Sequence, residues 1–345
     1  MRFRDVVPRL SHDGRAEKET VRQSVSIKRL RRDIEELSMP RNRLHSPQAM
    51  LSLEEYVHRE LEHAGWEVSH QSFSFRNVMG LVDYPVQDGN VTHLYSEVNG
   101  QNLVAIPRNC DRTAPPDIIV TAHMDTVKDC PGADDNASGI AGLLELARVF
   151  STDMPNRLAL AILDCEEIGF FGARAFVQQH SWVKATFVLE CIGYTNSNPR
   201  TQIVPSGLGL LYRDQMRFLR SSNFKADWAL ILYESSGTAL ANLMCESLST
   251  IAGTDRVMKI REPTSLPLVG GVLKRLFPWT GEFARSDHVE FWRAGIPAVL
   301  ITDTANFRNP NYHETTDTPE TIDYDFIADI VASLVKVIKV LDKAR

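Results

Sequence analysis

A series of short, almost wholly apolar runs that alternate with helix-like runs constrains this chain most. From residue 117 onward, "DIIVTAH", "LALAIL", "TFVL" and "PAVLIT" are separated by segments such as "GIAGLLELARVF" and "FGARAFVQQH". Strands buried on both faces have this apolar character, and they occur in parallel sheets covered by helices. The sequence therefore predicts an α/β fold with a mostly parallel central sheet and helices on both faces.

The segments around these runs predict a single large domain. Residues 46–66 are typical of a helix that begins after Ser46 and ends near Gly65, and "EVSHQSFSF" alternates like a strand. The last run, "DYDFIADIVASLVKVIKVLDKA", repeats apolar residues at helical spacing. Between about residues 197 and 285, Gly, Ser and Pro increase, and "PSGLGL" and "REPTSLPLVGG" are typical of loops. We expect one domain over residues 46–345, with a loop-rich lid or insertion at about 197–285.

Residues 1–45 differ from the rest of the chain in charge. They contain 12 Lys and Arg against 7 Asp and Glu, a balance of +5, whereas the whole chain carries −6. We expect a basic N-terminal arm or helix here, with "IKRLRRDIEEL" as the helical part. A solvated arm is a better interpretation of this charge than a patch for RNA or membrane.

Composition excludes several classes of protein. The charge of −6 leaves no basic footprint for nucleic acid. Residues 1–25 contain no apolar signal segment, and no apolar stretch reaches the ~18 residues of a membrane-spanning helix. Five cysteines without a tight spacing pattern are typical of reduced thiols. We expect a soluble, cytoplasmic protein with no nucleic-acid or membrane partner, and the sequence carries no signal of oligomeric state.

Candidate ligand groups follow the ends of the apolar runs. They are His123, Asp125, Asp135, Glu166, Glu167, Glu190 and His313. Because ligands of open α/β sheets bind outside the carboxyl ends of the strands, we expect these side chains to converge. Each has an ordinary explanation when taken alone, since "PGADDNASG" consists of turn formers, a single histidine is usually structural and an isolated Glu pair is usually solvated. Several carboxylates buried together would repel one another, and a cation resolves that conflict.

The types of ligand indicate which cation. Two histidines, carboxylates and no thiolate pattern suit zinc, with manganese or cobalt as substitutes. Asp125 lies two residues after His123 and can accept the other imidazole N–H, which would fix the direction of the ring. Cys165 and Cys191 are expected to be small buried residues and not ligands.

Six motifs, in the order "HMD", "PGADDNASG", "CEEIGFFGA", "LECIGY", "RSDH" and "NYHETTDTPETID", resemble the co-catalytic di-zinc aminopeptidase family. Its relatives include glutamate carboxypeptidases and glutaminyl cyclases. The likeness runs from about residue 47 to the C-terminus and is weakest across 200–280. It implies a zinc-exopeptidase (phosphorylase/hydrolase-like) architecture, two zinc ions per chain, and a cis peptide bond between Asp135 and Asn136.

The resemblance also implies a ligand set. His123 and Glu190 would bind the first zinc, Glu167 and His313 the second, and Asp135 would bridge both. Many members of the family have Asp where this chain has Glu190. The alternatives at this position are a ligand on a longer arm and an orienting carboxylate beside a single zinc.

Further residues gain roles from the same resemblance. Glu166 would be the general base, and Asp125 would support the first histidine. Tyr312 would either offer its phenol to the developing oxyanion or simply pack at the rim of the site. Asp287 of "RSDH" is expected to make structural bonds near the site, and Asp317 to cap or orient the loop that carries the last histidine.

The leading function is hydrolysis of peptide bonds by a zinc metallo-exopeptidase. It would be an aminopeptidase that removes N-terminal residues from short peptides with a free N-terminus, using a di-zinc-activated water and a glutamate base. One alternative is glutaminyl-cyclase-like acyl transfer at a single zinc. The other is a non-catalytic binding protein of the same fold, although such a protein should have lost ligands or the base.

Overall fold

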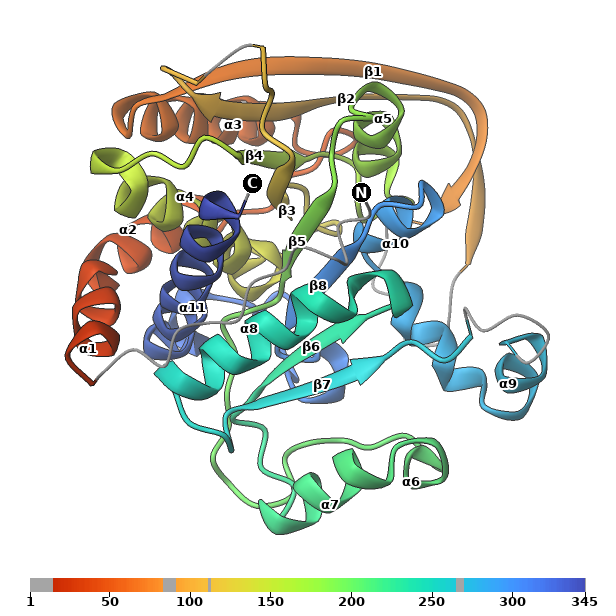
Figure 1. Cartoon of the computed structure of the whole chain (residues 1–345). Coiled ribbons are helices and arrows are strands. Elements are labelled where there is room, and N and C mark those ends of the chain that lie inside the picture. Colours follow the sequence, from red (N-terminus) through yellow and green to blue (C-terminus); the bar gives the residue numbers. More distant parts are fainter. Residues whose placement is uncertain (1–14, 83–90, 111–112, 265–269, 345) are drawn as a thin grey trace.

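One mixed sheet carries the apolar runs at its centre (Figure 1). The computed structural model describes residues 15–82, 91–110, 113–264 and 270–344. Strands within these ranges have the order β1-β2-β4-β3-β5-β8-β6-β7. They are β1 (Trp66–Leu81), β2 (Thr92–Pro107), β3 (Ile118–His123), β4 (Leu158–Leu163), β5 (Ala185–Glu190), β6 (Ala229–Tyr233), β7 (Val257–Arg261) and β8 (Ala298–Thr302). Because β4, β3, β5 and β8 pair in parallel, the predicted fold class is confirmed.

Helices cover both faces of this sheet (Figure 1). On one face lie α2 (Ile27–Leu37), α3 (Pro47–His63), α4 (Gly139–Val149), α8 (Thr238–Ile251) and α11 (Tyr324–Lys343). On the other lie α5 (Phe171–Gln179), α7 (Arg213–Ser221) and α10 (His288–Arg293). Side chains alternate between the two cores along each strand, so that Ile162 and Leu163 of β4 belong to different cores. Among the helices of the described ranges, none combines the length and apolar character needed to cross a bilayer.

Residues 197–285 contain more regular structure than their Gly- and Pro-rich sequence indicates. Besides the short helices α6 (Leu208–Leu211) and α9 (Gly270–Leu276), this region contributes β6, α8 and β7. Strand β6 pairs antiparallel with β8 and parallel with β7, which extends the sheet. The loop-rich expectation missed these elements because Gly, Ser and Pro lie mainly in the connections, whereas "ALILY" of β6 is an apolar, buried strand. Residues 265–269, inside the predicted loop "REPTSLPLVGG", lie outside the described residues.

The basic N-terminal segment packs against the helical layer. Beyond residues 1–14, which lie outside the described residues, it forms α1 (Arg15–Ser24) and α2. The apolar side of α2, including Leu30 and Ile34, is buried in the same core as α4 and α11. Glu145, which is buried in α4, accepts hydrogen bonds from the Ser26 N–H (2.6 Å) and from the Arg29 guanidinium (2.6 and 2.8 Å). These contacts tie residues 26–37 to the main domain.

Because Leu30 lies inside this core, we expect Leu30→Ala to lower the free energy of unfolding by about 2–5 kcal/mol, as large-to-small changes in packed cores do. Urea-induced unfolding followed by circular dichroism measures the change. Glu36→Ala, on the exposed side of the same helix, is the control and should stay within about 0.5 kcal/mol of the wild type. If Leu30→Ala were as stable as this control, α2 would not be packed on the core in solution.

Candidate metal centre

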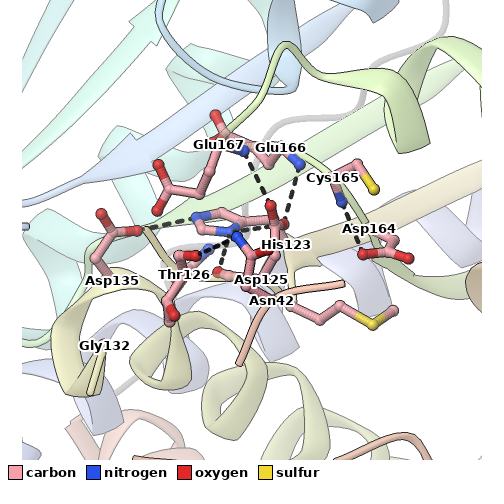
Figure 2. A network of polar contacts seen from close by, with 12 residues as sticks. Asn42, His123, Asp125, Thr126, Gly132, Asp135, Asp164, Cys165, Glu166 and Glu167 are labelled. Carbon is pink, nitrogen blue, oxygen red and sulfur yellow. Dashed lines mark hydrogen bonds and ion pairs between the residues drawn. The ribbon is translucent and has the colours of Figure 1, made fainter. Parts of the chain in front are cut away.

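The predicted ligand groups meet at one edge of the sheet. His123 is the last residue of β3, Glu190 is the last residue of β5, and Glu166 and Glu167 follow β4. Because these strands are parallel, their carboxyl ends lie side by side. Asp135 lies in the short helical turn η2 (Ala133–Ser138) that follows β3, and Figure 2 shows it facing the imidazole at the end of that strand.

The Asp135 carboxylate lies between two imidazoles. Its Oδ1 is 3.0 Å from His123 Nε2, and its Oδ2 is 3.1 Å from His313 Nε2. Burial alone would raise the pKa of the Asp135 carboxyl, but the two imidazoles beside its oxygens outweigh burial and hold that pKa well below its usual range. One carboxylate with an oxygen directed at each of two imidazole nitrogens is the arrangement that a ligand bridging two metal ions would require.

Each imidazole has a second carboxylate beside it. Glu190 Oε1 is 3.1 Å from His123 Nε2, and Glu167 Oε2 is 3.4 Å from His313 Nε2. The His313 Nε2 atom is buried, yet it makes no hydrogen bond of acceptable geometry despite these neighbours. A buried nitrogen aimed at two carboxylates without bonding to either fits a divalent cation held among them.

Ligand atoms of these residues cluster tightly enough for metal binding. Atoms of His123, Asp135 and Glu167 lie within 4.8 Å of one another, as do atoms of Asp135, Glu190 and Cys191. Burial raises the pKa of the Cys191 thiol well above its ordinary value. The other donors in these groups are imidazole nitrogens and carboxylate oxygens, which suit zinc.

Asp125 makes contacts that the sequence did not indicate. Its backbone oxygen is 3.1 Å from His123 Nδ1, while its carboxylate Oδ1 is 3.6 Å from that nitrogen. The carboxylate instead accepts the backbone N–H groups of Glu166 (3.0 Å) and Glu167 (3.1 Å) (Figure 2). One residue thus orients the imidazole through its carbonyl and fixes both glutamates through its side chain.

Glu166 is almost fully buried at the same edge. Burial raises the pKa of its carboxyl well above the ordinary value, and the carboxylates of Glu190 and Glu167 raise it further against the opposing charge of His123. Cys165, just before it, has a positive φ of 58°. This turn of the backbone ends the strand geometry, so adjacent glutamates need not point to opposite faces.

Tyr312 stacks on the last histidine. The rings of Tyr312 and His313 are 3.8 Å apart and tilted by 20°. Burial raises the pKa of the Tyr312 phenol well above its ordinary value, so the hydroxyl keeps its proton at neutral pH.

A cavity of about 130 Å³ lies beside the centre and is lined by both Glu190 and Tyr312. Most of its wall comes from the region 197–285 and is apolar or aromatic, with Trp228, Ile260 and Phe283 among the lining residues. A pocket of this character, next to the candidate metal ligands, can hold an apolar side chain of a bound molecule.

Two further side chains hold the candidate ligands in place. Ser286 Oγ donates to Glu190 Oε2 at 2.8 Å. The carboxylate of Asp317 accepts the backbone N–H groups of Asp134 (2.9 Å) and Asp135 (3.1 Å), so these bonds hold the loop that carries Asp135 and not the loop of the last histidine, which Asp317 was expected to orient. Hydrogen bonds of this kind leave no spacing pattern in a sequence.

Three further details concern residues near the candidate ligands. The peptide bond between Asp135 and Asn136 is cis, as the resemblance implies. The carboxylate of Asp134 accepts the Gly193 N–H (2.8 Å) and the Asn309 side-chain amide (2.7 Å). Asp287 is fully buried, but neither oxygen of its carboxylate has a hydrogen-bond partner among the described residues, so the structural bonds expected of this side chain are not made.

Comparison with known protein families assigns most of this chain to one family. Residues 102–338 match the model of peptidase family M28. The chain belongs to this family. The match confirms the resemblance inferred from the six motifs and covers every candidate ligand.

Individual proteins and structures share between 15% and 32% of their residues with this M28 chain. It is 32% identical over 236 residues to the uncharacterized protein YfbL of Escherichia coli (strain K12), an alignment that covers 64% of this chain and 65% of that protein. A zinc aminopeptidase from Bacillus subtilis superimposes with a TM-score of 0.61 at 15% identity, covering 91% of this chain and 94% of that one. A glutaminyl cyclase from Macrostomum lignano gives 0.64 at 15% identity, covering 99% and 97%. At such low identity these structures establish the fold alone.

The double contact of Asp125 leads to a stability prediction. In Asp125→Asn one oxygen would be replaced by an NH2 group that faces a backbone N–H, so a buried donor would lose its partner. We expect the free energy of unfolding to fall by about 1–3 kcal/mol. Urea unfolding in the presence of chelator measures it, with the exposed Asp129→Asn as the control. Unchanged stability of Asp125→Asn would contradict this role.

Proposed function

We propose that this M28 protein is a zinc-dependent aminopeptidase that removes N-terminal residues from short peptides and uses two zinc ions. The observation that carries the proposal is the Asp135 carboxylate, whose two oxygens lie 3.0 and 3.1 Å from two different imidazoles. Each imidazole also has its own carboxylate neighbour, so the donors divide into two sets that share one bridge.

Each set would hold one ion. His123, Glu190 and Asp135 would bind the first, and His313, Glu167 and Asp135 the second. Bound zinc supplies Lewis acidity, which polarises a carbonyl oxygen and makes water a stronger nucleophile at neutral pH. Support for zinc comes from the donor types and from the zinc aminopeptidase of the same fold.

Glu166 would move the proton. Its carboxylate takes a proton from the attacking water and delivers it to the nitrogen of the leaving amine. Burial and neighbouring carboxylates raise its pKa, which favours holding that proton between the two transfers. Tyr312, protonated at neutral pH, would donate its phenolic O–H to the carbonyl oxygen as negative charge develops there.

The neighbouring cavity supports cleavage at an apolar first residue. Its volume of about 130 Å³ is close to the roughly 150 Å³ that holds a benzene molecule in a protein interior. A leucine-sized or phenylalanine-sized side chain would therefore fill it. Glu190 lines the cavity as well, and its carboxylate would attract the ammonium group of a free N-terminus.

Zinc content and turnover test this proposal together. We expect about two zinc ions per chain, loss of turnover with chelator, and no cleavage of N-acetyl-leucine p-nitroanilide. Leucine and phenylalanine p-nitroanilides should exceed the glutamate compound at least about tenfold in kcat/KM, because burying a large apolar side chain is worth about 1.5–3 kcal/mol.

Other outcomes would overturn the assignment. Release of pyroglutamate from glutaminyl substrates, with one zinc per chain and no peptide hydrolysis, would favour cyclase chemistry. Absence of both zinc and turnover would leave a binding protein of the same fold.

A variant of the base separates proton transfer from metal binding. We expect Glu166→Gln to lower kcat by about 10²–10⁴-fold, because the amide cannot accept the proton. Zinc content should stay at the wild-type level. Glu55→Gln, on the exposed side of α3, is the control and should retain full activity. If Glu166→Gln kept a kcat near that of the wild type, another group would be the base.

A further inference from the structure

Arg41 is a fully buried arginine in the connection between α2 and α3. It lies outside residues 102–338, the part of the chain that matches the family model. Its guanidinium donates to backbone oxygens of two segments that flank the metal centre. Nε bonds to Met124 O (2.8 Å), Nη1 to Pro131 O (2.7 Å) and Nη2 to Gly132 O (3.0 Å).

The backbone around Arg41 is joined to the same loop. Its N–H donates to Thr126 Oγ1 (3.1 Å), and its carbonyl accepts the Thr126 N–H (2.8 Å). Asn42 continues the contact, since its side-chain amide donates to Thr126 O (2.9 Å) (Figure 2). Residues 41 and 42 therefore hydrogen-bond with the backbone and side chain of Thr126, in the loop that follows His123.

The oxygens that Arg41 binds belong to residues close to the ligands. Met124 directly follows His123, and Gly132 precedes Asp135 by three positions. Gly132 has a φ of +61°, and a Cβ atom there would meet Asp135 O at 2.3 Å and Arg41 Nη1 at 3.1 Å. The guanidinium thus spans both ends of the loop that separates one proposed imidazole ligand from the proposed bridging carboxylate, and the backbone at Gly132 leaves no space there for a side chain.

We infer that Arg41 is a positioning residue for the metal centre, which sets the separation of His123 and Asp135 by clamping the loop between them. The inference rests on the proposed zinc function. A planar guanidinium spreads its donors over three nitrogens and binds oxygens on both segments at once, whereas the three donors of a lysine ammonium lie on one nitrogen and cannot reproduce that spread. The N-terminal segment is on this account part of the metal site and not a separate arm.

Zinc affinity of the whole chain is the primary readout. The chelator-stripped wild type is titrated first with zinc against a chromogenic chelator. Failure of the wild type to bind zinc would reject the proposed function itself. In Arg41→Lys we expect zinc to bind about 10–100-fold more weakly, the range seen when partners that orient ligands are lost. We also expect kcat to fall while KM stays within about threefold.

Arg157→Lys is the matched control. Arg157 is also a largely buried arginine that donates to backbone carbonyl oxygens, those of Leu341 and Ala344. It also pairs with the Asp117 carboxylate, which directly precedes β3 and so lies at the opposite end of that strand from His123. Both variants remove an arginine from backbone acceptors, and Arg157→Lys also loses the two-point contact with Asp117, so their melting temperatures report the general cost of losing such an arginine. Of the two variants, only Arg41→Lys should have a lower affinity for zinc. Wild-type zinc affinity in a folded Arg41→Lys, or equal weakening in Arg157→Lys, would overturn the inference.

A second pair of variants covers the case in which Arg41→Lys does not fold. Thr126→Val removes the hydroxyl that accepts the Arg41 N–H but keeps the shape of the side chain. Thr126→Ser keeps the hydroxyl. We expect the valine variant to bind zinc more weakly and the serine variant to match the wild type. Equal zinc affinity in the two variants would contradict a role of this segment in positioning the loop.

Discussion

Carboxylates crowded in a buried space are the constraint on which this structure depends. Asp135, Glu166, Glu167 and Glu190 meet at the end of a sheet whose strands are otherwise apolar. Removing such groups from water is costly, and placing them together adds repulsion. Two imidazoles and the ions proposed between them offset that cost, and hydrogen bonds made by Asp125, Asp317 and Ser286 help to keep the carboxylates in place.

The contacts that keep them in place are mostly made to the backbone. Asp125 accepts two N–H groups of the glutamate pair, and Asp317 accepts two N–H groups of the bridging loop. Arg41 donates to backbone carbonyl oxygens of Met124 and Gly132, at the two ends of the loop between His123 and Asp135. Backbone groups are fixed more rigidly than side chains, so a ligand anchored through them loses little additional freedom when a metal binds.

The sequence predicts the fold class and the candidate ligands because both depend on patterns within the chain. Apolar runs such as "LALAIL" predict buried strands, and acidic or imidazole residues at their ends are visible without a structure. The strands β6 and β7 were not predicted, since loop-forming residues around them obscured a short apolar run. Arg41 was not predicted either, because its acceptors are backbone oxygens 83 to 91 residues away that any residue type can supply.

The cavity beside the centre has a wall supplied largely by residues 197–285, whereas all but one of the candidate ligands lie between residues 123 and 190. The shape of the cavity is therefore determined largely by residues 197–285, and the metal-binding groups come largely from residues 123–190. Substitutions, insertions and deletions in residues 197–285 can change which molecule fits the cavity while residues 123–190 stay the same. Such a division allows one reaction centre to diversify over evolutionary time by exchanging its surroundings.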